Sequence, residues 1–525
     1  MNGFNLSDII DAKLGTTTLG SIYLGSTKLW PTHDYSQDYF TIESLHNDNV
    51  IGFQRSGSNV KSYIADIRYS TDGNTWYLIN ADDTGSFIIL NVGDKIYIKP
   101  GDIYNIVTTS AYPHFTSTYD VNVYGNVNSV RDPNFKTNHI MIDQTYFYYR
   151  LFNGLKIVDA SNLVFPYTTL GKYCYTYMFD GCSSLATAPK LPATTLASSC
   201  YSNMFKGCTS LTAAPELPAT TLESSCYYSM FRDCTSLTAA PELPATTLVS
   251  SCYNSMFRDC TSLTAAPVLP ATTLASSCYS NMFQNCTSLT AAPELPATTL
   301  TGTYCYSNMF NGCTSLATAP VLPATTLTDF CYRNMFYGCT SLATAPVLPA
   351  TTLANSCYAY MFEGCSSLAT APELPATTLA NSCYMSMFAA TKITAAPELP
   401  ATTLIDSCYR NMFYGCASLR YPPTLNATIL QPRCYQHMFF GCTSLKTAPE
   451  LPAKTLSTYC YAYMFQNCTS LSYIKCLATN ISASNSHDWW LYDVASTGTF
   501  VKPSSMYSWP ANAHGIPSGW TVVNV

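Results

Sequence analysis

The sequence predicts an α+β repeat protein: a solenoid of about 12–13 coils of 26 residues, preceded by a β-sandwich and a small N-terminal hairpin. The main observation is a 26-residue unit that recurs twelve times between Cys174 and Leu477. A fixed period of this length is typical of a solenoid, in which each unit buries its apolar face against the next. The second observation is a series of short alternating apolar runs before the repeats, which indicates β-strands.

Each unit divides into a compact half and an extended half. In the unit that starts at Cys200, Ser198 and Ser199 precede Cys-Tyr-x-x-Met-Phe, whose apolar spacing favours one buried face of a short helix. Gly207 stands where that helix would end in a left-handed residue. The following Ala-Pro-Glu-Leu-Pro segment should be extended, and its prolines limit the strands to two to four residues.

Two units depart from the pattern. The unit starting at Cys383 is one residue short and has Phe388-Ala389-Ala390-Thr391 where the others have Phe-x-Gly-Cys, so we expect its helix to end differently. Residues 151–170 resemble a degenerate thirteenth unit, as expected of an N-terminal cap.

The flanking sequences complete a four-part division: a docking segment (1–34), a β-sandwich (35–137), the solenoid (138–477) and a C-terminal cap (478–525). A hairpin as small as the one predicted in the first part is not stable alone, so it must dock on the next domain or on another protein. The docking residues that we expect are Ile22, Tyr23, Leu24, Leu29 and Trp30. Four of the six tryptophans lie in the last part, where a cap over the open coil is favoured over a binding site.

Composition excludes several classes of function. Charged residues are 11% of the chain and the net charge is −6, which argues against a nucleic-acid partner. No apolar run approaches the roughly 18 residues of a membrane span. The first residues lack the features of a secretory signal peptide, so the 24 cysteines are expected to be buried thiols. Two cysteines of one helical unit would lie ~12 Å apart, too far for a disulfide, whereas bridges between units stay open.

No cofactor or metal site is expected, because Cys-x-x-Cys is absent from the sequence and none of the seven histidines recurs with the repeat. No catalytic triad, phosphate loop or carboxylate pair has the required spacing either, so we expect no enzyme activity.

Aromatic residues that the repeat does not explain are the candidate binding residues. Exposed rings on a surface poor in charge suit sugar stacking or a protein contact. Packing against another subunit is an equal alternative, and a homo-oligomer is therefore expected. The candidates are Tyr304, Phe330, Tyr337, Tyr360, Tyr414, Tyr421, Phe440, Tyr459 and Tyr463.

At the repeat, the chain resembles the leucine-rich repeats of BspA-like bacterial surface proteins. Met204-Phe205-x-x-Cys208-x-x-Leu211 reproduces the first half of that unit, whereas Ala-Pro-x-Leu-Pro replaces its Ile-x-Ile-Pro. Residues 69–76 look like an immunoglobulin-like hairpin. The string from Ile22 to Trp30 is similar to segments near the start of tailed-phage virion proteins of the gut Bacteroides type.

These resemblances imply two alternative functions. The first is a virion structural protein, assembled in the host cytoplasm, that acts as a fibre, decoration or receptor-binding component. Its N-terminal segment would bind other virion proteins, and its repeats would contact a glycan or protein of the bacterial surface. The second is a BspA-like adhesin located on the bacterial cell surface. A depolymerase has no residue constellation to support it.

Overall fold

The computed structural model describes the strand residues 13–14, 17–18, 22–24 and 27–30, then residues 34–56, 67–79, 86–101, 112–132, 134–136, 146 and 148–525, with the exceptions of 508, 511 and 513. Near the N-terminus, β1 (Lys13–Leu14) pairs with β2 (Thr17–Thr18), and β3 (Ile22–Leu24) pairs with β4 (Thr27–Trp30), both antiparallel. The second pair is the predicted hairpin. The five proposed docking residues lie on its strands, and what they dock on stays a prediction.

Two β-sheets follow the hairpin. The larger has the order β13-β12-β5-β10-β7-β8, with β14 also paired to β12, and the smaller has the order β11-β6-β9. The rings of Phe40 and Phe53 both pack on Phe115, which joins the two sheets at their inner faces. The immunoglobulin-like assignment remains a prediction. The strands are β5 (Phe40–Ser44), β6 (Asn49–Ser56), β7 (Ile67–Ser70), β8 (Tyr77–Ile79), β9 (Ser86–Leu90), β10 (Lys95–Pro100), β11 (Tyr112–Ser117) and β12 (Val121–Asn126).

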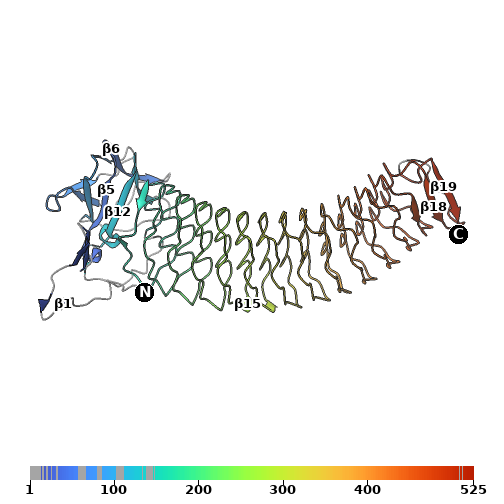
Figure 1. The fold of residues 1–525 in the computed structure, drawn as a ribbon, viewed down its shortest axis with the longest axis horizontal. Helices are drawn as coiled ribbons and strands as arrows, with labels where there is room; N and C mark the ends of the chain where they lie inside the picture. Colours follow the sequence, from blue (N-terminus) through green and yellow to red (C-terminus); the bar gives the residue numbers. More distant parts are fainter. Residues whose placement is uncertain are drawn as a thin grey trace.

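The larger sheet runs directly into the solenoid. Strands β13 (Ile157–Asp159) and β14 (Leu163–Val164) belong to the first coil, and both pair in parallel with β12. Asp159 then bridges to Thr187 of the next coil. Figure 1 shows the result, a shallow arc of stacked coils with the β-sheets at one end. The predicted solenoid with coils 26 residues apart is confirmed.

Each coil contributes two very short parallel strand segments. One series of bridges joins Ala213, Ala239 and Ala265, and the other joins Thr195 to Thr221 and Thr247 to Thr273. Only β15 (Thr273–Leu274) and β16 (Thr299–Leu300) extend the second series into true strands, on the outer side of the arc in Figure 1. The prolines lack the N–H that a longer ladder needs.

The compact half of each coil is not helical, which corrects the α+β prediction. The described residues contain no α-helix, only 3₁₀ turns at Tyr35–Gln37 and Val127–Val130. From Ser199 to Cys208, backbone N–H groups alternate between two partners. Those of Tyr201 and Phe205 donate to the next coil, and those of Met204 and Cys208 donate three residues back.

Left-handed residues close these turns at every fourth position. Ser199, Asn203 and Gly207 have φ angles of 56°, 55° and 73°. A series of four-residue turns points two successive side chains inward every four residues, and a helix also repeats its face after four residues. The apolar spacing therefore predicted the buried residues correctly, but the helix that we inferred from it was wrong.

The irregular unit keeps the same turn. Ala390, at the usual glycine position, has a φ of 56° and donates its N–H to Tyr414 O at 2.7 Å. The expectation that the compact half of this unit ends differently was wrong. Inter-coil hydrogen bonds hold the backbone in a conformation that costs alanine more than glycine.

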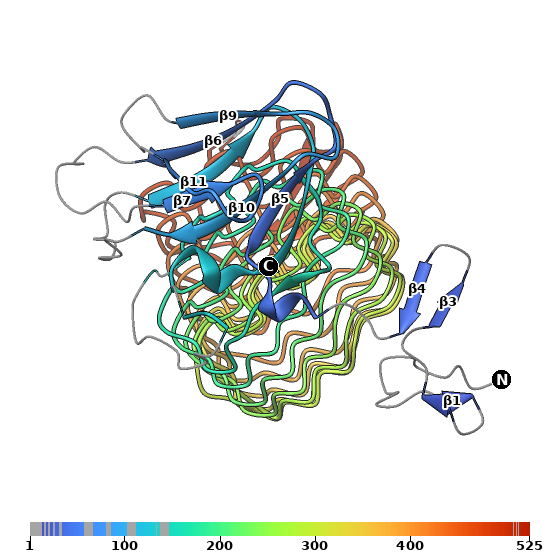
Figure 2. The ribbon, with the colours of Figure 1, turned by 90° about the vertical axis from the view of Figure 1, so that its left-hand side faces the viewer.

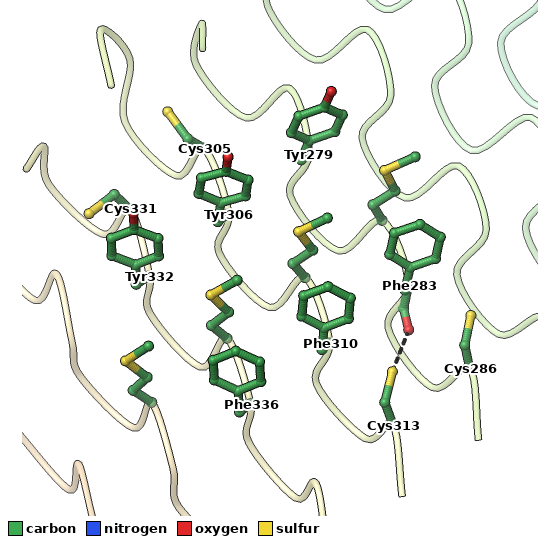
Figure 3. Packing of buried hydrophobic residues seen from close by; sticks show 14 of the residues in the cluster. Tyr279, Phe283, Cys286, Cys305, Tyr306, Phe310, Cys313, Cys331, Tyr332 and Phe336 are labelled. Atoms are coloured by element: carbon green, nitrogen blue, oxygen red, sulfur yellow. Dashed lines mark hydrogen bonds between the residues drawn. The ribbon is translucent and has the colours of Figure 1, made fainter. Parts of the chain in front are cut away.

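Aromatic ladders fill the core. The tyrosine ladder runs from Tyr148 to Tyr461 with ring centroids 5.4–6.2 Å apart. The phenylalanine ladder runs from Phe152 to Phe465 at 5.2–5.9 Å. Figure 3 shows three neighbours of each. Phe40 of the sheet stacks on Phe152, so the N-terminal sheets cover the first coil.

The cysteines form two further buried columns of thiols. The Sγ of each second cysteine donates to the carbonyl oxygen of a phenylalanine in the preceding coil, as Cys313 does to Phe283 at 3.0 Å. In the irregular coil, Thr391 Oγ1 donates to Phe388 O at 2.8 Å instead. Burial raises the pKa of nearly all these thiols, for example to about 12 at Cys313 and Cys468. They are therefore neutral, weakly reactive core groups.

The coil geometry continues past Leu477 into the predicted cap. Strands β17 (Tyr473–Lys475), β18 (Gly498–Lys502) and β19 (Trp520–Asn524) form a parallel sheet. Asn485, Trp489 and Asp493 repeat the left-handed positions of the preceding coil. Trp490 is fully buried beneath both aromatic ladders, stacked on Tyr461 and tilted against Phe465. Viewed from the N-terminal end in Figure 2, successive coils lie behind one another.

Candidate functional site

The candidate surface is the wall made by the turn segments equivalent to residues 199–208, here called the turn wall. Within each segment, the side chains of the first cysteine, tyrosine, methionine, phenylalanine and second cysteine point inward. The remaining positions lie on the outer side of these columns and change from coil to coil, although small residues there, such as Ser229 and Ala359, are buried. Larger side chains at these positions reach the surface, so packing constrains them less than it constrains the core.

Three of the predicted residues, Tyr304, Phe330 and Tyr360, form a cluster on the coils that start at Cys305, Cys331 and Cys357. The rings of Tyr304 and Phe330 stack with centroids 4.6 Å apart and planes within 4°. The guanidinium of Arg333 lies 5.7 Å from the Phe330 ring and 5.4 Å from the Tyr360 ring. Tyr337 lies on the same wall and is exposed.

A second cluster lies four coils further on, on the coils that start at Cys408, Cys434 and Cys460. Tyr414 and Phe440 stack at 4.6 Å, and Tyr463 stacks on His437, a residue that sequence reasoning did not select, also at 4.6 Å. Burial, with the charge of Arg410, lowers the pKa of His437 to about 4, so its ring is neutral at pH 7. Tyr459 OH accepts a hydrogen bond from the side-chain amide of Asn485.

Tyr421 does not join either cluster. It lies on the strand segment of its coil, bridged to Ala395, with 68% of its surface exposed. The structure thus brings eight of the nine predicted rings onto the turn wall and places Tyr421 on a different side of the coil.

The stacking limits what these rings can bind. Within each pair, one ring covers a face of the other, so the pair presents its edges and its two outermost faces. A sugar that packs its apolar face on a ring needs an uncovered face. The arrangement therefore favours contact along the wall, over several coils, above insertion between two stacked rings.

Sequence reasoning missed aromatic residues at both ends of the wall. In the first coils, Tyr146 stacks on Tyr173 at 4.6 Å, and Arg150 lies 4.9 Å from the ring of Tyr177. In the last coil, Trp489 and Tyr492 are exposed. Aligning the degenerate first unit and the cap on the repeat would have placed these residues at outward positions.

The wall between the rings of the first coils and the cluster around Tyr304 carries mainly charged side chains in place of rings. Arg232 and Arg258 lie 3.8 and 3.2 Å from the carboxylate of Asp259, and Lys206 lies 4.0 Å from Asp180. Desolvation raises the pKa of the Asp180 and Asp233 carboxyls. These charges satisfy one another along the wall and leave little unbalanced charge for a partner.

No group of three or more histidine, cysteine, aspartate or glutamate side chains in the part of the chain that the structure describes is placed to hold a metal ion. Likewise, none of the described residues forms a helix with the length and apolar character to cross a bilayer.

The geometry defines a capped leucine-rich-repeat solenoid with a variable outer wall. The BspA type leucine rich repeat region matches the chain in six copies, over residues 122–290, 276–420 and 360–488. Because this match covers well over half of the 525 residues, the chain belongs to that family. No curated protein matches the chain. Repeats of this type indicate a role in surface adhesion or binding to a protein or glycan.

Proposed function

We propose that this chain is a non-enzymatic binding protein whose turn wall attaches to a glycan or protein of the bacterial surface. The observation that carries the proposal is the pair of aromatic clusters, around Tyr304–Phe330 and around Tyr414–Phe440. Other coils have serine at the position of Tyr304, for example Ser225 and Ser251, with the same left-handed backbone. The fold does not require a ring there, so a contact with a partner is the simpler reason for it.

The location that we propose is a phage virion, in which the N-terminal hairpin holds the protein on the particle. The support is the resemblance of the segment Ile22–Trp30 to the start of tailed-phage structural proteins, together with a hairpin too small to be stable alone. The alternative is a bacterial surface adhesin, which the BspA-type family favours.

The binding role is tested with the full-length chain and intact bacteria from its source community. We expect the double variant Tyr304→Ser/Phe330→Ser to lose at least about tenfold in affinity, since central aromatic residues dominate interfaces. Tyr228→Ser is the control, because it removes an exposed ring from the charged stretch of the same wall. Equal binding by all three proteins would contradict the proposal.

The location is tested by quantitative mass spectrometry of density-purified particles and of the cell envelope from one culture. Enrichment in particles, lost on deletion of residues 1–34, is expected for a virion protein. Enrichment of the protein in the envelope, with none in particles, would contradict the virion role and support the surface adhesin.

A further inference from the structure

Four buried polar atoms without hydrogen-bond partners occur together in the second aromatic cluster. They are Arg410 Nε, Asn411 Oδ1, Gln436 Oε1 and His437 Nδ1. The four residues occupy the same two outward positions on adjacent coils, and the backbones of Asn411 and Gln436 are joined by a hydrogen bond of 2.9 Å. A buried polar atom left without a partner destabilises a fold, so a concentration of four needs an explanation.

Other coils carry a smaller pair of residues at these positions. Where a serine precedes the left-handed asparagine, the amide nitrogen donates to the serine hydroxyl: Asn203 to Ser202 at 2.8 Å, and Asn281 to Ser280 at 2.9 Å. At Asn411 the preceding residue is Arg410, and on the next coil Gln436 and His437 stand at the same two positions. These three larger side chains bring Arg410 Nε, Gln436 Oε1 and His437 Nδ1, three of the four unpartnered atoms, to the wall.

The chemistry of the four groups indicates their ligand. Arg410 Nε is a donor, the two amide oxygens are acceptors, and the neutral His437 ring offers either role. A hydroxyl group both donates and accepts, so a polyol matches such a mixed set, whereas a phosphate or carboxylate would face the two amide oxygens. Arg410, Asn411 and His437 are only partly buried, so side-chain rotation brings their polar atoms to the surface.

Aromatic rings border the same place. The His437 ring lies 5.9 Å from Phe440 and 6.4 Å from Tyr414, and its other neighbour is the stacked ring of Tyr463. Rings beside a group of mixed donors and acceptors suit a sugar, which has an apolar C–H face and polar hydroxyl edges.

We propose that the turn wall at Arg410, Asn411 and His437 is a saccharide subsite, in which sugar hydroxyls bind the polar groups of these three side chains and a sugar C–H face packs on the bordering rings. This proposal rests on the proposed binding function and names its ligand class and position. It places a sugar at the second aromatic cluster, in addition to the contact that the first cluster makes with the bacterial surface.

The test replaces these side chains with the Ser-Asn pair that other coils carry at the same positions. The triple variant Arg410→Ser/Gln436→Ser/His437→Asn gives both coils the Ser-Asn pair found at Ser202–Asn203. We expect its melting temperature to rise, because three of the four buried unpartnered atoms are removed, and its saccharide binding to fall at least tenfold. Arg258→Ser is the matched control, since it removes an arginine from the same wall outside the cluster and should leave binding unchanged.

The probe is an array of neutral hexose and N-acetylhexosamine oligosaccharides with their uronic-acid counterparts, followed by calorimetry of the best binder. The subsite is supported if the triple variant loses saccharide binding and the Arg258→Ser control keeps it. Either of two results would overturn it: no saccharide binding by the full chain, or binding that the triple variant retains. If the full chain still bound whole cells without any saccharide affinity, the binding function would stand and its ligand would be a protein segment.

Discussion

Two stretches of one wall differ in this protein while the backbone beneath them stays the same. Between Asp180 and Asp259 the outward side chains are charged and pair with one another. Between Tyr304 and Tyr463 they include eight Tyr and Phe rings, accompanied around His437 by polar atoms without hydrogen-bond partners. The inner ladders continue through both stretches without change.

This difference shows that the inward and outward positions of one repeat unit have separate roles. The inward columns specify the coil, because a missing ring would leave a cavity between its two neighbours. The outward positions hold serine, arginine, tyrosine or alanine in different coils. The charged stretch pairs its charges with one another and contains one unpartnered buried atom among its outward side chains, Arg232 Nε, whereas the aromatic stretch gathers four such atoms on two adjacent coils.

Phe439 and Phe440 give the strongest test of this separation, because they are adjacent and face opposite ways. Phe439 is fully buried between Phe413 and Phe465, whereas Phe440 stacks on Tyr414 at the surface. We expect Phe439→Ala to cost about 3–5 kcal/mol in unfolding free energy and Phe440→Ala about 0.5–1.5 kcal/mol. Chemical denaturation of the full chain measures both. Equal losses would mean that the outer rings are structural.

The left-handed turns give a smaller effect of opposite sign. Ala390→Gly removes a Cβ from a backbone with a φ of 56°, so it should stabilise the chain by about 0.5–1 kcal/mol. The matched change Gly415→Ala, at the same position of the next coil with a φ of 69°, should destabilise it by a similar amount. Both variants are read by thermal unfolding. If the glycine at 390 destabilised the chain, the argument about turn strain would be wrong.

The sequence alone predicted most of this architecture. The period, the inward cysteine, tyrosine, methionine and phenylalanine columns, and the short strands beside the prolines all follow from spacing and backbone chemistry. The helix was wrong because Cys200, Met204 and Phe205 have a spacing that fits both a helix and a series of four-residue turns. The left-handed residue at Gly207 was anticipated, and those at Ser199 and Asn203 were not, since serine and asparagine do not require that conformation.

The candidate surface could be predicted only in part. Excess aromatic residues are visible in the sequence, and eight of nine were placed on one wall. The polar groups around His437 were not visible, because an Arg-Asn or Gln-His pair carries no signal until the Ser-Asn pairs of other coils show what has been replaced.

The charged stretch should respond to salt, and the aromatic stretch should not. Arg258 lies 3.2 Å from Asp259 and is about one-third exposed, so Arg258→Ser should cost only about 0.2–1 kcal/mol at low ionic strength. At about 1 M salt, where the screening length is about 3 Å, we expect that loss to shrink toward zero. Tyr337→Ser is the comparison in the aromatic stretch. If Tyr337→Ser also lost unfolding free energy in a salt-dependent way, charge pairing would not distinguish the charged stretch from the aromatic one.

The smallest effect concerns the pH dependence of stability near His437. Its pKa in the folded chain is about 4, below the ordinary value of 6.5, because burial disfavours the charged ring. Between these values the unfolded chain binds a proton that the folded chain does not, so stability should fall as the pH drops from about 6.5 to about 4. His437→Asn should remove this part of the pH dependence, measured as the difference between the two proteins' melting temperatures at pH 7 and pH 4.5. If that difference did not change with pH, His437 would not be held neutral by the wall, and the neutral ring that the saccharide subsite requires would lose its support.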